Sequence, residues 1–103
     1  MKMSISTTTS GLSPIHPGEL LREILDDLKM SQAAFARVID VSPMRISHIV
    51  RGERPVTAEM ALLFGHAFGQ SPQMWTNWQA EYDLKIAERK IADTLKNLPR
   101  LAA

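Results

Sequence analysis

The chain has 103 residues, the length of one domain near the lower size at which a hydrophobic core stabilises itself. Hydrophobic residues make up 45% of it, too many for a disordered protein, and the formal net charge of +1 excludes a strongly basic nucleic-acid-binding protein on total charge alone. The lack of cysteine excludes disulfides and thiolate metal sites, and no apolar run is long enough for a membrane span or a signal region. We therefore expect a cytoplasmic protein that makes no membrane contact.

Residues 1–13 are rich in Ser and Thr, which predicts a flexible N-terminal arm. A first helix is expected from Pro17, because proline suits the first helical position, and His16 is expected to help begin it. The apolar residues that follow recur at helical spacing and predict one buried stripe. They are Leu20, Leu21, Ile24, Leu25 and Leu28.

Four further helices are predicted from hydroxyl side chains that can cap a helix, two of them directly followed by proline. Between the second and third helices, Asp40 is expected in the left-handed conformation and Val41 is expected to return to the core. No segment shows the alternating pattern of a strand. The predicted helices run from Ser31 to about Ile39, from Ser42 to about Arg51, from Thr57 to Gly69, and from Ser71-Pro72 into the eighties.

The third predicted helix is short, apolar on one side and polar on the other. Ile46, Ile49 and Val50 share the inner side at about 100° per residue. Two short helices joined by a tight turn, the second with a polar outer face, describe a helix-turn-helix, whose second helix enters the DNA major groove. An ordinary solvated helix face is the alternative. The two caps, the tight turn and the basic loop after the helix favour DNA binding.

Each polar residue of this region has an expected role on DNA. Arg45 can read guanine through two hydrogen bonds, and Met44 can contact a thymine methyl group. Arg51 and Arg54 suit phosphate contacts, and Gln32 can anchor the start of the second helix on a phosphate. The candidate DNA-binding residues are therefore Gln32, Ser42, Met44, Arg45, Ser47, His48, Arg51 and Arg54.

The last predicted helix carries more apolar surface than one small core needs. One short recognition helix also reads too few base pairs for specific binding, so two copies on an inverted repeat are expected. We expect this helix to build much of a two-fold homodimer, its aromatic residues lying in the core or at the interface. The candidate dimer residues are Trp75, Trp78, Tyr82, Leu84 and Ile86.

Patterns typical of catalysis or cofactor binding are missing from the sequence. His16, His48 and His66 lie far apart, with no carboxylate paired to them at metal-ligand spacing. There is no Gly-rich phosphate loop and no nucleophile elbow. We expect neither an enzyme nor a bound metal or cofactor.

The stretch "MSQAAFARVIDVSPMRISHIVRGERPVT" resembles the helix-turn-helix of phage repressors and Cro. With the flanking "HPGELLRE" and "SPQMWTNWQAEYDL", the similarity extends to the HigA-type antitoxins of bacterial toxin–antitoxin modules and covers about residues 15–87. This resemblance implies an all-α, five-helix, lambda repressor-like DNA-binding domain over residues 14–87. A C-terminal helical extension or tail is expected over 88–103. It also implies a dimer, a partner toxin of the RelE/HigB class that cleaves mRNA, and repression of the module's own promoter.

Several positions depart from the family pattern. The family prefers Gly at Asp40, and it generally has polar residues at Val38 and Leu63, which are therefore extra core or an apolar contact for a partner. Pro43-Met44 leaves the operator sequence undetermined. Two other functions stay open: a stand-alone repressor without a toxin, and a toxin inhibitor that no longer binds DNA. A ribonuclease-like gene beside this one, and a gel shift on its own promoter, would discriminate among the three.

Overall fold

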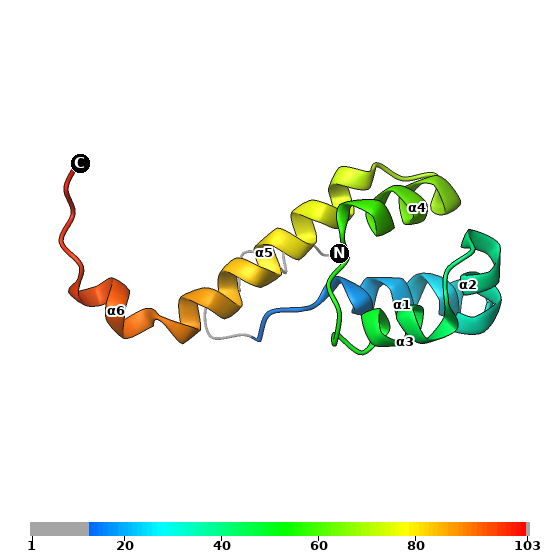
Figure 1. Cartoon of the computed structure of the whole chain (residues 1–103), viewed down its shortest axis with the longest axis horizontal. Helices are drawn as coiled ribbons and strands as arrows, with labels where there is room; N and C mark the ends of the chain where they lie inside the picture. Colours follow the sequence, from blue (N-terminus) through cyan, green and yellow to red (C-terminus); the bar gives the residue numbers. More distant parts are fainter. Residues whose placement is uncertain (1–12, 103) are drawn as a thin grey trace.

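A computed structural model describes residues 13–102, and within that range it contains helices and turns but no strand. The expected all-α class is confirmed, whereas the predicted arm lies almost wholly outside the described residues. The first four helices and the start of the fifth form a bundle, and the rest of the fifth extends away from it (Figure 1). The helices are α1 Pro17–Asp27, α2 Gln32–Ile39, α3 Pro43–Val50, α4 Ala58–Phe68, α5 Pro72–Lys90 and α6 Ala92–Asn97.

The helix starts follow the predicted caps. The side chains of Ser31, Ser42 and Thr57 each accept a backbone N–H three residues further on, at 3.0, 3.1 and 3.2 Å. Ser71 accepts from Gln73, 3.2 Å away. The predicted extension is helical at α6, but the break that makes α6 a separate helix was not predicted. Helix α5 passes residue 87 without a break before ending at Lys90.

Two helix ends rest on a left-handed residue that carries a side chain. Asp40 has φ 60°, as predicted, and lets the N–H of Val41 reach the carbonyl of Ala36 at 2.9 Å. Lys29 has φ 55°, which was not predicted. Because the chain turns there, Leu28 leaves the apolar stripe of α1, and the prediction that it is buried was wrong: its side chain is 55% exposed.

Aromatic rings fill the core between α2, α4 and α5. Phe35 stacks on Phe68, with ring centroids 5.0 Å apart, and Phe64 meets Trp75 edge-on at 5.0 Å. The indole N–H of Trp75 donates to the side-chain oxygen of Gln70 at 2.9 Å. Trp75 is 0% exposed within a single chain, so it has no surface to give to a partner. Its assignment to a dimer interface is therefore corrected to the core.

α1 and α3 approach each other backbone to backbone. A Cβ atom at Gly18 would overlap the carbonyl oxygen of Ile49, which cannot move without its helix. Leu21 and Ile46 are fully buried beside this approach. The absence of a side chain at position 18 thus sets how closely α3 lies against α1.

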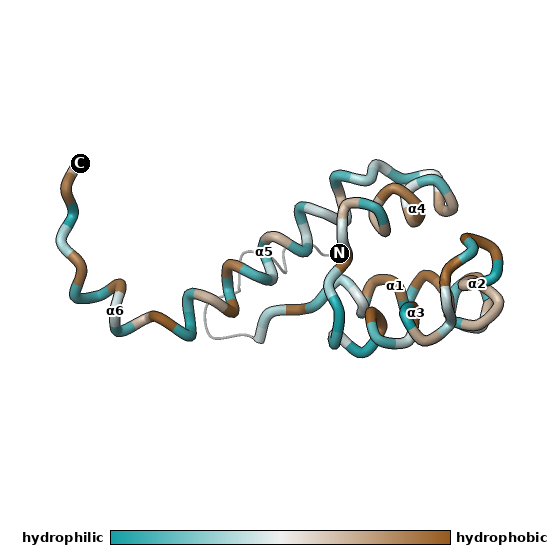
Figure 2. The backbone as a smooth tube through the Cα atoms, in the orientation of Figure 1, coloured by the Kyte–Doolittle hydropathy of each residue, from teal (hydrophilic) through white to brown (hydrophobic). Residues whose placement is uncertain are grey.

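The distal part of α5 and α6 has little of the chain to pack against. Brown and teal residues alternate along it, well away from the bundle (Figure 2). Leu84 and Ile91 are 61% and 44% exposed, and Leu95 and Leu98 on α6 and just after it are 48% and 58% exposed. No helix within residues 13–102 is long and apolar enough to cross a membrane.

Candidate nucleic-acid interface

The structure builds the expected helix-turn-helix from α2 and α3. Three residues, 40–42, connect the two helices. Ile46 and Ile49 are 0% exposed, which fixes the inner side of α3 against the bundle. Met44 on the other side is 67% exposed, although so large an apolar side chain is usually covered.

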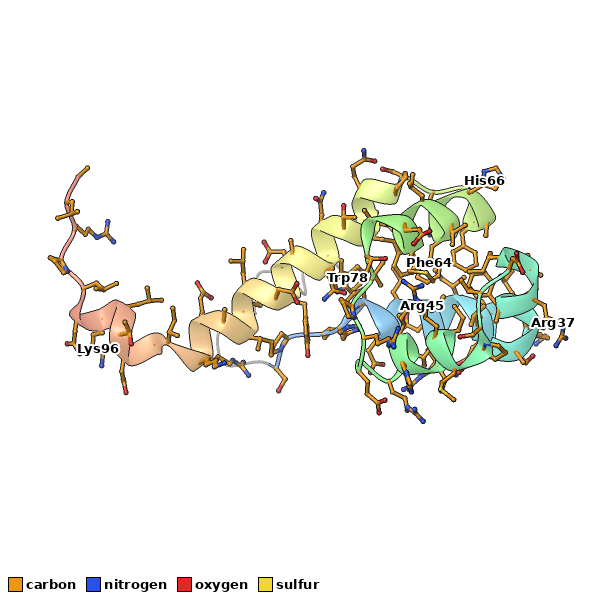
Figure 3. All side chains as sticks on the ribbon, in the orientation of Figure 1. Arg37, Arg45, Phe64, His66, Trp78 and Lys96 are labelled. Atoms are coloured by element: carbon orange, nitrogen blue, oxygen red, sulfur yellow. The ribbon has the colours of Figure 1, made fainter. Side chains whose placement is uncertain are left out.

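The candidate DNA-binding residues occupy one continuous region. Met44, Arg45, Ser47 and His48 lie on α3, and Arg51 and Arg54 lie in the turn that follows it. We call these six residues the α3 surface. Met44, Arg51 and Arg54 are exposed, and the other three are half-buried. Figure 3 shows Arg45 among the bundle helices, at the opposite end of the molecule from Lys96 on α6.

Two candidates lie beside this surface and have structural roles of their own. The hydroxyl oxygen of Ser42 accepts the N–H of Arg45, so it caps α3 and retains its hydrogen and one lone pair for another partner. Gln32 is the first residue of α2 and is half-buried. Val38 is 65% exposed on α2, whereas Leu63 packs against the core.

An acidic residue that sequence reasoning missed pairs with the α3 surface. The carboxylate of Glu53 lies 3.2 Å from Nε of Arg51 and accepts a second bond from its terminal nitrogen at 3.3 Å. Nε2 of His48 is 3.9 Å from the same carboxylate. Only its position in the turn, two residues after Arg51, hinted at this pairing.

The turn after α3 is held to α5 by a buried glutamine. Gln79 is 7% exposed, accepts the N–H of Val56 at 2.8 Å, and donates to the Asp83 carboxylate at 2.9 Å. Sequence reasoning missed it as well. A signal existed, since Gln79 lies one turn after Trp75 and therefore on the buried side of α5.

His16 joins three parts of the molecule. Its Nδ1 accepts the N–H of Gly18 at 2.9 Å, which confirms its expected role at the start of α1. Its ring meets Tyr82 edge-on at 4.9 Å, and the backbone of Arg54 is a further hydrogen-bond partner. Gly52, with φ 77°, lies so close that a Cβ there would contact the imidazole at 3.6 Å.

Burial lowers the pKa of His16 below its ordinary value of 6.5. Asp83, the hydrogen bond with Arg54 and Glu19 act in the opposite direction, but desolvation is the largest cause. The imidazole is thus held neutral, the form in which Nδ1 can accept from Gly18.

The other aromatic dimer candidates also have partners within the chain. The indole of Trp78 donates to the carbonyl of Ile15 at 2.8 Å, and Tyr82 packs on His16. Both remain half-buried, so part of each ring is open to solvent. Leu84 and Ile86 are exposed, at 61% and 42%.

A family model described as helix-turn-helix matches residues 21–75. Virulence-associated protein I of Dichelobacter nodosus is 46% identical over 88 residues, which cover 84% of this chain and 82% of that relative. The solved Pseudomonas aeruginosa antitoxin HigA with the higBA promoter superimposes with a TM-score of 0.82 and 40% identity, over 86% of this chain and 99% of that one. A HigA-family addiction module antidote protein from Coxiella burnetii gives a TM-score of 0.82 and 37% identity over the same shares.

The buried His16 predicts a specific pH dependence of stability. Its pKa is lower in the folded chain than the ordinary 6.5 of an unfolded one, so the unfolded chain binds more protons between the two values. The free energy of unfolding should therefore fall as the pH drops below about 6.5. His16→Asn, which keeps a capping side chain, should make the free energy of unfolding depend less on pH, as measured by urea denaturation at about pH 7.5, 6.5 and 5.5. His66→Asn, at an exposed position of α4, is the control and should keep the wild-type dependence. An unchanged pH dependence in His16→Asn would contradict the assignment.

Proposed function

Because this chain belongs to the helix-turn-helix family, and within it to the HigA-type antitoxins, we propose that it binds the operator of its own promoter as a dimer and neutralises an mRNA-cleaving toxin of the RelE/HigB class. Members of this family are DNA-binding regulators and antitoxins rather than enzymes, which agrees with the expected lack of catalysis. The observation that carries the proposal is the α3 surface. Met44 is exposed on a helix whose inner side is buried, with Arg45 on the same helix and Arg51 and Arg54 in the turn after it.

On the operator, α3 lies in the major groove with its N-terminal part against the base edges. Arg45 binds guanine and Met44 contacts a thymine methyl group. Arg51 and Arg54, in the turn at the other end of the helix, bind phosphates and set the register. The Pseudomonas aeruginosa HigA structure contains the higBA promoter, which supports the same partner for this chain.

The dimer is proposed to form through the distal part of α5 and α6. Leu84 lies on α5, and Ile91 directly follows its last residue, Lys90, with its N–H still bonded to the carbonyl of Ala87 at 3.0 Å. The two are seven residues apart, about two helical turns, so Ile91 continues the side of the helix that carries Leu84. Ile86 lies about 200° round the helix from Leu84, nearly on the opposite side, so it falls outside that surface. Leu84 and Ile91 are both exposed and apolar, and none of the described chain covers them, which suits contact with a second copy related by a two-fold axis.

Neutralisation of the toxin is proposed to use a surface other than the α3 surface. A protein that binds its toxin and its promoter at the same time needs a separate surface for each partner. We expect the toxin to contact the N-terminal arm, α1 or the C-terminal region.

The first test compares two arginines on DNA. Arg45→Ala should cost about 1–3 kcal/mol of operator binding and little on random duplex, because Arg45 reads a base. Arg54→Ala should weaken binding to both duplexes by a similar factor. It should also reduce the slope of log K against log salt concentration by about 0.9, because Arg54 neutralises one phosphate. Anisotropy titrations at several salt concentrations measure both effects. No loss in either variant would show that α3 does not enter the groove as proposed.

The dimer is tested by Leu84→Asp combined with Ile91→Asp. Sedimentation should then show a monomer, and operator binding should fall to single half-site strength, because charges replace the proposed interface. Leu62→Asp is the matched control, since Leu62 on α4 is also 61% exposed. Inserting about half a turn of DNA between the half-sites should likewise lower the operator binding of the wild-type protein to single half-site strength. A double variant that stays dimeric would rule this interface out.

The two activities are separated by Arg45→Ala combined with His48→Ala. This variant should lose operator binding and still protect cells that express the toxin, because the toxin lies elsewhere. Growth after toxin induction measures protection, and circular dichroism controls for folding. A folded variant that fails to protect would show that the toxin shares the α3 surface. A wild type that protects cells but does not shift its own promoter would favour an inhibitor that no longer binds DNA.

A further inference from the structure

Glu53 places a negative charge on a surface otherwise made for DNA. Both of its carboxylate oxygens contact the Arg51 guanidinium, at 3.2 and 3.3 Å, and His48 lies 3.9 Å from it. A two-point pair fixes the plane of a guanidinium better than a single contact does. DNA carries phosphates with the same charge, so Glu53 stands where a phosphate of the duplex could otherwise bind Arg51.

The backbone holds Glu53 in this position. Gly52 takes the left-handed conformation, its N–H reaches the carbonyl of Ile49 at 3.0 Å, and the N–H of Glu53 reaches that of His48 at 2.8 Å. These are the paired bonds of a Schellman helix end. The side chain of residue 53 therefore starts from a fixed point beside the last turn of α3.

Resting on the DNA binding proposed above, we propose that Glu53 is a specificity-determining residue. Its carboxylate offsets the charge of Arg51, which weakens attraction to random DNA. It also orients the guanidinium toward the place that a phosphate occupies when the α3 surface is bound at the operator. Glu53 takes two contacts, and a guanidinium has five N–H donors, so Arg51 keeps donors for a correctly placed phosphate.

The two kinds of DNA respond differently to this pair. Random duplex is bound almost entirely through counterion release, to which a neutralised Arg51 contributes little. The operator is bound through base contacts as well, and these favour a single placement of the α3 surface along the duplex. There the oriented donors of Arg51 meet a phosphate at a fixed place, so Glu53 lowers random binding more than operator binding.

Glu53→Gln removes the charge and keeps the size of the side chain. Binding to random duplex should tighten about two- to fivefold, the range for one exposed charge pair. The slope of log K against log salt concentration should steepen by about 0.9. Operator binding should change by less than about twofold, so the ratio of operator to random affinity falls. Glu53→Asp, which keeps the charge, should stay near the wild-type ratio.

Glu23→Gln is the matched control. Glu23 lies on the exposed side of α1, between the buried Leu21 and Leu25, and loses the same charge without facing α3. It should leave both affinities unchanged. Equal tightening on operator and random DNA by Glu53→Gln, or no more change than in Glu23→Gln, would overturn the proposal.

A measurement without DNA tests the pair itself. In the free protein, the Nε–H of Arg51 should exchange with solvent more slowly in NMR spectra than that of Arg54, which has no carboxylate within ion-pair distance in residues 13–102. Glu53→Gln should remove this difference. Equal exchange in the wild type would overturn the proposal whatever the DNA result. A protected Arg51 in a wild type that binds no operator would instead overturn the proposed DNA binding, and with it this role.

Discussion

The close approach of α1 to α3 at Gly18 is the contact on which the rest of the interface depends. A helix of eight residues has little stability of its own, so tertiary packing must hold α3 in place. Backbone-to-backbone contact with Ile49 supplies a rigid stop, because neither side can adjust by changing a rotamer. The buried Leu21 and Ile46 then fix the rotation of α3 about its axis. The direction in which Met44 and Arg45 point follows from this packing.

A second layer of contacts fixes the turn after α3. His16 reaches it from the start of α1, and Gln79 reaches it from α5 through the N–H of Val56. These two polar side chains are the buried ones of the described chain, and each satisfies backbone groups that would otherwise be orphaned. The turn that carries Arg54 is thus held from two helices, although it lies at the surface.

The helix starts could be predicted from the sequence because they depend on residues close together in the chain. Ser31, Ser42 and Thr57 cap helices where their spacing predicted, because a cap depends only on the next three residues. Lys29 carries no comparable signal, since a left-handed lysine is selected by the fold around it, and the error at Leu28 follows from that turn. Trp75 was ambiguous because an aromatic stripe on a helix serves a core and an interface equally well until the other helices are placed.

The candidate site divides in the same way. The residues of α3 could be chosen from helical periodicity, because the buried positions define the outer side. Glu53 could not, since its partner Arg51 is brought close by a turn. Periodicity indicates that Gln79 is buried, but not that it binds Val56, which is distant in sequence. Polar residues acquire such roles only through tertiary placement.

α5 is one unbroken helix that belongs to the core at Trp75 and Gln79 and leaves it at Leu84. A continuous helix transmits both length and rotation, at about 1.5 Å and 100° per residue. In the proposed dimer, the number of residues between Gln79 and Leu84 therefore sets the distance and the relative angle between the two copies of α3. Adding or removing a single residue there would turn each copy of α3 by about 100° about the axis of its own α5, while leaving both copies folded. In that dimer, the spacing of the half-sites would be set by a segment of α5 away from the α3 surface, and operator geometry would constrain its length more than its composition.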